Sequence, residues 1–171
     1  MNTQPENLVA QLSNFSVFKS LNQGHLERIA PLLKVYKIKA GEILFSEGAV
    51  GEDLYFLLQG KMQISQRLTM LSDETETQIR EKCLVVLSGD SYPSFGEMSI
   101  LNRHPRSATL TALEGSELRE LSHSDFLNLV RDDPALGVQL LLNLSEIVCT
   151  NLETANHNIL KLTTALSLAL R

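Results

Sequence analysis

The chain has 171 residues, of which 43% are hydrophobic, so it is long enough to bury the core of a single domain. With 20% charged residues, the composition is that of an ordinary soluble protein. The formal net charge of −5 argues against a dedicated nucleic-acid-binding protein, because such a protein carries a basic face toward the phosphates.

The segments that would mark a secreted or membrane protein are not visible in the sequence. MNTQPENLVAQL has no basic segment followed by an apolar one, so no signal peptide is expected. No apolar run approaches the ~18 residues that a membrane span needs. Cys83 and Cys149 lie far apart without a CxxC pattern, and we expect each to be a free, buried thiol, as suits a reducing compartment. The sequence therefore predicts a cytoplasmic protein with no membrane contact.

The first third of the chain shows two short runs of helical period. They cover residues 7–12 and 22–33, and Asn22 or Gly24 can start the second. Pro31 predicts a kink or an early end of this second helix, because proline has no N–H to donate within a helix. The sequence therefore predicts an α-helical N-terminal segment.

After Lys34 the apolar period changes to two, which is typical of β-strands. The expected strands lie in residues 35–48, 53–67, 79–90, 109–114 and 116–122. The glycines that supply turns between them are Gly41, Gly48, Gly60, Gly89 and Gly115.

These strands lead to a fold class. Gln59-Gly60 between two alternating runs predicts a β-hairpin, and the acidic segment Asp73–Glu76 is expected at a solvated hairpin tip. Many short strands at nearly even spacing are typical of a jelly-roll-like antiparallel β-barrel made of two sheets. The predicted fold is therefore mainly β, with flanking helices.

Helical signals return at Ser122. Ser124-Asp125 can cap a short helix through Val130, and Asp133-Pro134 combines a strong N-cap with proline at the first helical position. Two lines of mostly apolar residues then recur every seven positions: Leu141, Val148, Ala155, Leu162 and Ala169, and Ser145, Leu152, Ile159 and Leu166. Packing on the chain's own barrel would account for the first turns only. A seam of this length favours pairing with a second copy, so a homodimer is expected.

The string FGEMSILNRHPRSAT carries the chemistry. A turn that ends at Gly96 and opens a helix would aim the free N–H groups of Met98 and Ser99 at one point, where anions are attracted. Arg106 supplies a permanent cation whose planar fork matches two phosphate oxygens. Glu97 cannot bind a phosphate, so in the same site it must meet the hydroxyl side of a ligand. These residue types indicate a sugar phosphate or a nucleotide.

FGEMSIL followed by PRSATLTALEGSELREL closely resembles the phosphate-binding cassette of the cyclic nucleotide-binding domain family. This family includes the catabolite activator protein, the regulatory subunits of cyclic-AMP-dependent kinase and cyclic-nucleotide-gated channels. The resemblance begins near Phe15, where FSVFKSL and HLERIAPLL match small helices that pack beside the barrel. It implies a barrel domain with N-terminal helices in residues 1–133. It also implies a long helix in residues 134–171 for dimerisation and for covering the ligand.

The resemblance assigns a role to the central site residues. Arg106 would make the paired contact to the cyclic phosphate, and Glu97 would accept the ribose 2′-hydroxyl. Gly96 would let the backbone approach the ligand closely, because it lacks a Cβ. Ser107 matches a position that touches phosphate or base, and the N–H of Ala108 can donate to phosphate.

Further residues would complete the site. After Phe95 and Gly96, the short helix would be formed by Met98, Ser99 and Ile100. Ile100 and Leu101 would anchor this helix in the barrel. Leu84 and Val86 are candidates for an apolar wall beside the purine, although strand alternation leaves their facing open. From the covering helix, Asn151 and Thr150 could hydrogen-bond an adenine edge.

One segment departs from the family pattern, and one site residue does not distinguish between the possible ligands. Residues 91–94 make a longer connection before the cassette than is usual, and we expect it to bulge at the barrel mouth. Ser107 does not separate cAMP binders from cGMP binders, since both carry small residues there. The expected ligand is cAMP, with cGMP as the alternative, and no metal is expected.

Three other classes of protein compete with a cyclic nucleotide sensor. A cupin metalloenzyme needs two closely spaced histidines with a following carboxylate, which this sequence does not have. It also has no visible nucleophile-base arrangement or glycine-rich triphosphate loop, so no enzyme activity and no catalytic residues are expected. The chain has no reader for a DNA groove, yet it could be the ligand-binding part of a longer transcription regulator. A protein-interaction scaffold that has lost its ligand is disfavoured by Glu97 and Arg106, because buried charges without partners are costly. A downstream partner protein is expected, and the sequence does not identify it.

Overall fold

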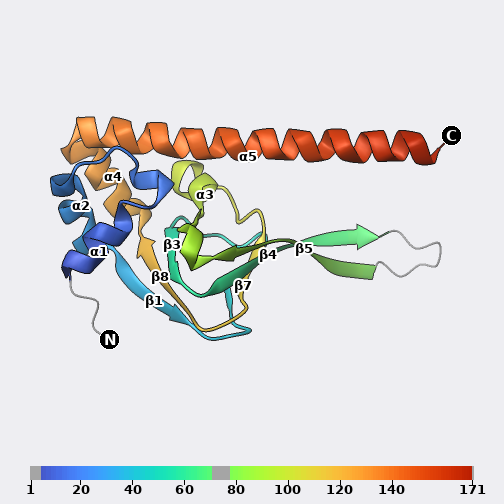
Figure 1. The fold of residues 1–171 in the computed structure, drawn as a ribbon, viewed down its shortest axis with the longest axis horizontal. Coiled ribbons are helices and arrows are strands. Elements are labelled where there is room, and N and C mark those ends of the chain that lie inside the picture. Colours follow the sequence, from blue (N-terminus) through green and yellow to red (C-terminus); the bar gives the residue numbers. More distant parts are fainter. Residues whose placement is uncertain (1–4, 71–77, 171) are drawn as a thin grey trace.

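The computed structural model describes residues 5–70 and 78–170. In this part of the chain the strands form two antiparallel sheets that face each other, with helices at one end (Figure 1). One sheet has the order β1 (Lys34–Ile38), β8 (Ser116–Leu121), β3 (Leu54–Gln59) and β6 (Ser94–Phe95). The other has the order β2 (Ile43–Phe45), β7 (Thr109–Ala112), β4 (Lys61–Met70) and β5 (Gln78–Ser88). The predicted jelly-roll-like architecture is confirmed.

The predicted hairpin at Gln59-Gly60 is wrong. The strands on either side of this turn lie in different sheets, so the chain crosses between sheets here. Gly60 has φ +96° and faces Ser116 so closely that an added Cβ would collide with that side chain. The paired hairpin is formed by β4 and β5, from Lys61 opposite Ser88 outward. The acidic segment Asp73–Glu76 falls outside the described residues.

The N-terminal segment is helical, as predicted. It contains α1 (Pro5–Leu12), η1 (Ser16–Phe18), α2 (Gln23–Ile29) and η2 (Ala30–Leu32). The Asn22 side chain caps α2 by accepting from the N–H of His25 at 2.9 Å. The α-helix ends at Ile29, and the chain tightens into the 3-10 turn that contains Pro31. Pro31 therefore ends the helix early, because the residue cannot extend the hydrogen-bond ladder.

Two clusters of buried side chains hold the fold together. The larger one joins the N-terminal helices to β3 and to the C-terminal helices, and it contains the stacked rings of Phe18 and Phe56, 4.8 Å apart. Phe15 packs edge-on against both rings. The smaller cluster lies between the sheets around Leu57, Met62 and other barrel residues. Burial of this apolar surface is the main force that keeps the helices on the end of the barrel.

The C-terminal helices are α4 (His123–Asp132) and α5 (Pro134–Ala169). The cap of α4 is Ser122 and not the predicted Ser124, since the Ser122 hydroxyl accepts from the N–H of Asp125 at 3.1 Å. The Asp133 side chain caps α5 by accepting from the N–H of Leu136 at 3.1 Å, with Pro134 at the first helical position. This capping arrangement is the predicted one.

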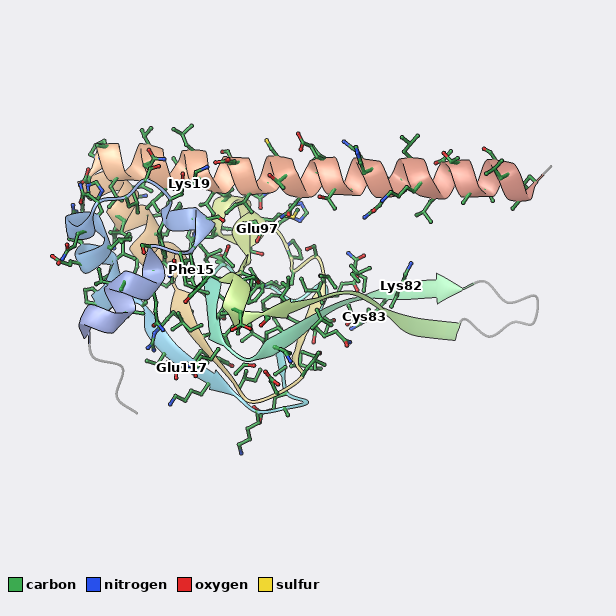
Figure 2. All side chains as sticks on the ribbon, viewed as in Figure 1. Phe15, Lys19, Lys82, Cys83, Glu97 and Glu117 are labelled. Atoms are coloured by element: carbon green, nitrogen blue, oxygen red, sulfur yellow. The ribbon has the colours of Figure 1, made fainter. Side chains whose placement is uncertain are left out.

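Only the first part of α5 packs on the rest of the protein. Leu136, Leu140 and Leu144 are fully buried, whereas every residue from Cys149 to Leu170 is exposed. The helix runs past the barrel and its side chains stand free along the distal half (Figures 1 and 2).

The expectation of buried thiols is wrong, because Cys83 and Cys149 are free but exposed.

The length and composition of α5 also pass a simple test for a membrane span. An 18-residue window reaches a mean hydropathy of 1.3, and 28% of that window is buried inside the protein. The expectation that no run comes near this length is therefore wrong. Core helices of soluble proteins share this length and composition, so these two features alone do not assign α5 to a membrane.

Candidate functional site

The site begins at α3 (Glu97–Asn102), a short helix that starts directly after Gly96. Gly96 has φ +97°, a left-handed conformation that favours glycine. A Cβ at this position would lie 2.5 Å from Nη1 of Arg106 and 2.5 Å from the carbonyl oxygen of Asp53. Gly96 is thus needed both for its backbone conformation and for the close approach of an arginine side chain.

Arg106 is 5% exposed and lies against an aromatic ring. Its guanidinium carbon is 4.3 Å from the centroid of Phe45 and 5.6 Å from that of Tyr55. Its Nη1 donates to the carbonyl oxygen of Asp53 at 3.0 Å, while its buried Nε has no partner among the described residues. Burial lowers the pKa of Arg106 from its usual value. A buried guanidinium with an unused donor is suited to receive an anion.

The backbone of Arg106 is fixed by the loop between β2 and β3. Its N–H donates to the carbonyl oxygen of Ala49 at 2.9 Å, and its own carbonyl oxygen accepts from Gly48 at 2.8 Å. Tyr55, whose ring lies 5.6 Å from the guanidinium carbon, stands opposite Glu120 in the pair of β3 and β8. Burial raises the pKa of Tyr55 to about 12, and it also raises the pKa of the Glu120 carboxyl.

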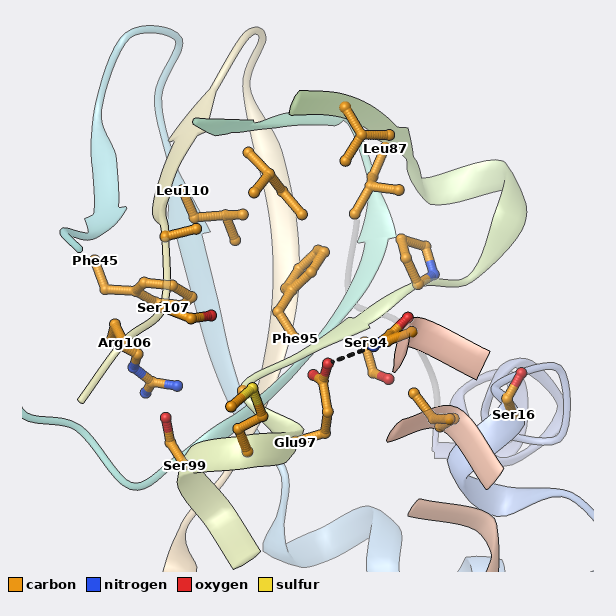
Figure 3. Close-up of a pocket in the computed structure, with 18 of the residues that line it drawn as sticks. Ser16, Phe45, Leu87, Ser94, Phe95, Glu97, Ser99, Arg106, Ser107 and Leu110 are labelled. Carbon is orange, nitrogen blue, oxygen red and sulfur yellow. Dashed lines mark hydrogen bonds between the residues drawn. The ribbon is translucent and has the colours of Figure 1, made fainter. Parts of the chain in front are cut away.

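Glu97 contacts the long helix. Nδ2 of Asn151 donates to Oε1 of Glu97 at 2.9 Å, the contact marked by a dashed line in Figure 3. Asn151 was expected to face an adenine edge, and here it binds the acidic residue of α3 instead. The nearby Thr150 hydroxyl donates to the Glu146 carbonyl oxygen of its own helix at 2.9 Å.

A cavity of about 390 Å³ lies between α3, the barrel and α5 (Figure 3). The nine residues predicted for the site all line this cavity: Phe95, Gly96, Glu97, Met98, Ser99, Arg106, Ser107, Ala108 and Asn151. They come from β6, α3, the loop before β7, and α5. The structure thus brings together residues that are up to 56 positions apart, from Phe95 to Asn151.

The predicted residues differ in how free their polar groups are. The hydroxyl of Ser99 donates to the His104 carbonyl oxygen at 3.0 Å, so it steadies the cassette loop. The carbonyl oxygen of Ser107 accepts from Gln66 at 2.9 Å. Ile100 is buried, as expected of an anchor, whereas Leu101 is 38% exposed.

On β5 the residues that line the cavity are Val85 and Leu87, and not the predicted Leu84 and Val86. A register shift in the β4–β5 pair places Val85 opposite Ile64 and Cys83 opposite Ser65, so that Leu84 is the extra residue. Such a bulge interrupts the alternation of side chains along a strand. The side chains of Leu84 and Val86 are about half exposed, at 49% and 48%.

The connection in residues 91–94 forms part of the cavity wall. It runs from the last residue of η3 (Gly89–Ser91) to the first residue of β6, and all four of its residues line the cavity. The ring of Tyr92 packs edge-on against Phe15, with centroids 5.3 Å apart. No sequence pattern marks the remaining lining residues, which distant elements bring to the site: Ser16, Phe45, Ile64, Leu110 and Ile147.

The arrangement favours an anionic ligand with a hydroxyl group. Arg106 supplies a fixed positive charge, the first turn of α3 supplies backbone N–H groups, and Glu97 supplies an acceptor close to both. In the described residues 5–70 and 78–170, no group of three or more His, Cys, Asp or Glu side chains is placed to hold a metal ion.

Comparison with known proteins points to one family. Residues 35–133 match the family model described as "Cyclic nucleotide-binding domain". The cGMP-dependent protein kinase, isozyme 1, of Drosophila melanogaster is 31% identical over 128 residues, covering 74% of this chain and 16% of that protein. The Cyclic AMP receptor protein of Thermus thermophilus is 32% identical over 100 residues, covering 58% of this chain and 42% of that protein.

Solved structures similar to this chain point to the same family. The Thermus thermophilus Catabolite Activator Protein superposes with a TM-score of 0.72 at 26% identity, covering 86% of this chain and 63% of that one. The regulatory domain of Toxoplasma gondii PKA, co-crystallised with cAMP, has a TM-score of 0.62 at 30% identity, covering 77% and 46%. This chain spans only 16%, 28% and 60% of the length of the first curated relatives that it matches.

Proposed function

Because this chain belongs to the cyclic nucleotide-binding domain family, we propose that it is a regulatory sensor that binds cAMP in the cavity between α3 and α5. The observation that carries the proposal is the convergence of a buried guanidinium and a carboxylate on one cavity of about 390 Å³. A cation and a nearby acceptor are what a phosphate and a ribose hydroxyl require.

The phosphate would bind at Arg106. Among the described residues, this side chain lines the cavity and meets no carboxylate within ion-pair distance, so its charge is open to a phosphate. The N–H groups of Met98 and Ser99 in the first turn of α3, with that of Ala108, would supply further donors. Because the guanidinium is already held by Phe45 and the Asp53 carbonyl oxygen, little ordering remains for the ligand to impose.

The ribose and base would lie between Glu97 and the apolar wall. Glu97 would accept the 2′-hydroxyl, either on its second oxygen or in place of the Asn151 amide. Val85 and Leu87 would contact the purine face. Both cAMP and cGMP carry the phosphate and the 2′-hydroxyl that this site would bind. We propose cAMP as the ligand because the Asn151 amide could also turn toward an adenine edge.

The signal would pass from α3 to the C-terminal helices. Glu97 is bonded to Asn151 on α5, and Nδ1 of His123, at the start of α4, is 2.9 Å from the carbonyl oxygen of Ile100. A ligand that draws α3 toward its phosphate would therefore act on both helices. It can shift their packing only by the difference in its affinity for the two arrangements.

The exposed half of α5 would pair with a second copy of the chain. Leu152, Ile159 and Leu166 lie on one line of the heptad pattern and are each about 60% exposed. Pairing these helices would remove their apolar surface from water. The proposed sensor is thus a homodimer whose α5 seam carries the output to a partner protein.

Calorimetric titration of the purified protein with cAMP and with cGMP tests the proposal. We expect saturable binding of one cAMP per protomer, and weaker binding of cGMP. Binding of neither nucleotide at millimolar concentration would refute the sensor function. Tighter binding of cGMP would keep the sensor and change its ligand.

A further inference from the structure

Two glycines bracket the guanidinium of Arg106. Gly96 lies at Nη1, as described above, and Gly51, in the loop between β2 and β3, lies at the opposite end. A Cβ on Gly51 would be 2.9 Å from both Nε and Nη2 and 3.3 Å from Cζ. Real Cβ atoms essentially never come closer than 3.0 Å to another heavy atom, so such a side chain would force something to move.

These distances show which side of the guanidinium Gly51 occupies. The central carbon is farther from the added Cβ than the two nitrogens that flank it. The Cβ would therefore lie beyond the Nε–Nη2 edge, in the plane of the group, and not above its face. The face is covered by the ring of Phe45 at 4.3 Å.

The guanidinium cannot move aside without losing contacts. Its Nη1 is bonded to the Asp53 carbonyl oxygen, and the backbone of Arg106 is bonded on both sides to the loop of Gly48 and Ala49. A Cβ at the Nε–Nη2 edge would therefore turn or push the group toward the cavity.

We propose that Gly51 is a positioning residue for the ligand phosphate, a role that rests on the proposed function of the cavity. The absence of a side chain at residue 51 sets the depth and tilt at which Arg106 presents its donors. Gly51 does so without a special backbone conformation, because its φ lies outside the left-handed region that Gly96 occupies. Space alone thus explains why glycine stands at position 51.

Gly51→Ala isolates this role, and Gly115→Ala is its control. Gly115 also lacks a positive φ, and a Cβ there would meet nothing within 4 Å. In titrations with cAMP we expect Gly51→Ala to weaken binding by about tenfold, the scale of a modest steric conflict. The control variant should stay within about twofold of the wild type.

A readout specific to position comes from the two diastereomers of adenosine 3′,5′-cyclic phosphorothioate. They differ only in which exocyclic oxygen is replaced by sulfur. A displaced guanidinium should change the ratio of their two affinities by about threefold or more, because it meets a different oxygen. A loss of fold stability alone would weaken both by the same factor, and that result would overturn the proposal.

A ligand-free measurement separates this inference from the proposed function. Gly51→Ala should lower Tm by about 3–6 °C in the presence of Arg106, relative to the control, and by less than about 1 °C in an Arg106→Ala background. An equal loss in both backgrounds would mean that Gly51 does not act through Arg106. If Gly51→Ala does not fold, the double variant should fold, and its failure would also overturn the proposal. If the wild type binds no cyclic nucleotide, the proposed sensor function is refuted. The melting temperatures of these variants would still show whether residue 51 acts through Arg106.

Discussion

Arg106 is a buried cation that meets no carboxylate within ion-pair distance among the described residues. It is held by Phe45 and by the Asp53 carbonyl oxygen, which leaves its full charge available to a ligand. An anion that enters the cavity therefore displaces no acidic side chain from the guanidinium.

Arg106→Ala should weaken cAMP binding by about 2–5 kcal/mol, roughly 30-fold to several-thousand-fold, as for the loss of one partner of a buried charge pair. Arg106→Lys should also bind poorly, because an ammonium cannot make the paired contact of a planar fork. Calorimetric titration measures both. A loss below about threefold for the alanine variant would mean that Arg106 does not hold the phosphate.

Glu97→Gln should weaken cAMP binding less than Arg106→Ala does, and the size of its effect should depend on the sugar of the ligand. The carboxylate would accept the ribose 2′-hydroxyl, so the variant should weaken cAMP by about 1–2 kcal/mol and leave 2′-deoxy-cAMP almost unchanged. The comparison of two ligands on one variant controls for any change in folding. Equal losses on both ligands would remove Glu97 from the ribose.

At this scale the sequence predicted which residues meet but not how they are oriented. The string from Phe95 to Ala108 is local, so its residues reach one cavity once α3 forms after Gly96. The facing of Val85 could not be read, because residues 83–87 are apolar on both faces of the strand and either face could meet the cavity. Gly51 and Phe45 were missed because their role appears only when their loop meets Arg106.

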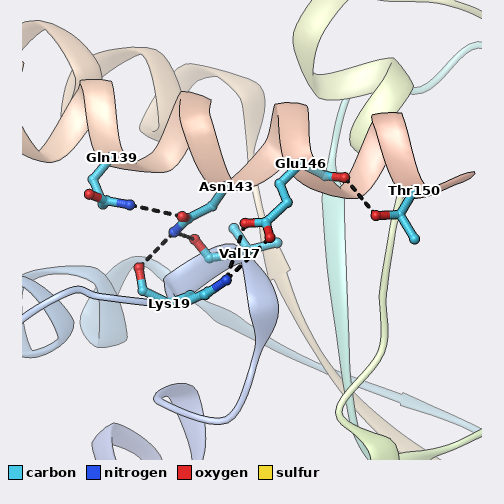
Figure 4. A network of polar contacts seen from close by, with 6 residues as sticks. All are labelled: Val17, Lys19, Gln139, Asn143, Glu146 and Thr150. Atoms are coloured by element: carbon cyan, nitrogen blue, oxygen red, sulfur yellow. Dashed lines mark hydrogen bonds and ion pairs between the residues drawn. The ribbon is translucent and has the colours of Figure 1, made fainter.

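Among the secondary-structure elements, α5 and η1 are joined by one buried amide. Nδ2 of Asn143 donates to the carbonyl oxygens of Val17 and Lys19, both at 2.8 Å, and its oxygen accepts from Gln139 at 2.9 Å (Figure 4). Asn143 is 3% exposed. The ion pair between Lys19 and Glu146, at 3.2 Å, is exposed and adds little. The amide therefore fixes the base of α5 beside the cavity.

Asn143→Asp should destabilise the fold by about 2–4 kcal/mol, because it replaces a donor by a charged acceptor that faces two carbonyl oxygens. Urea unfolding of the ligand-free protein measures this loss. Asn156→Asp, at an exposed position of the same helix, adds the same charge and should leave the free energy of unfolding almost unchanged. Equal stability of the two variants would show that the buried amide does not anchor α5.

The start of α5 should make stability depend on pH. The hydrogen bond from the Leu136 N–H, followed by the bond from Arg28, lowers the pKa of the Asp133 carboxyl from its usual value. A carboxyl with a lowered pKa in the folded state stabilises the fold above its unfolded pKa of about 3.9, and that contribution is lost as the pH falls through the folded value. Thermal melts should therefore show less acid destabilisation in Asp133→Asn, which still caps the helix. Identical pH profiles for wild type and variant would contradict this linkage.

The sequence predicted most elements because their signals are local. Asn22, Asp133-Pro134 and Pro31 each act on the backbone of their own helix, and the structure has them in these roles. The turn at Gln59-Gly60 was misread because a glycine between two alternating runs looks the same whether the strands pair or separate. The two strands separate because β3 pairs with β8 and β6, whereas β4 pairs with β7 and β5, and no pattern around Gly60 encodes these pairings.

For the whole molecule, the exposed half of α5 is the feature that most needs a partner. A helix of 36 residues is about 54 Å long, and the protein covers only its first turns. Leu152, Ile159, Leu162 and Leu166 lie on the two heptad lines and are exposed, while the exposed Leu160 and Leu168 lie off these lines. Beyond the edge of the barrel, the chain's own barrel cannot cover these apolar side chains. Two such helices can bury them against each other.

Leu152→Glu should convert a dimer into a monomer in sedimentation velocity at micromolar concentration, because it places two like charges in the centre of the seam. His157→Glu adds the same charge at an exposed position away from both heptad lines, and it should remain a dimer. A wild-type protein that sediments as a monomer without detergent, but associates with lipid vesicles, would assign the apolar stripe to a membrane. A Leu152→Glu variant that stays dimeric would place the interface on another surface. Either result would leave the ligand-binding proposal intact, because the cavity residues named here all come from one chain.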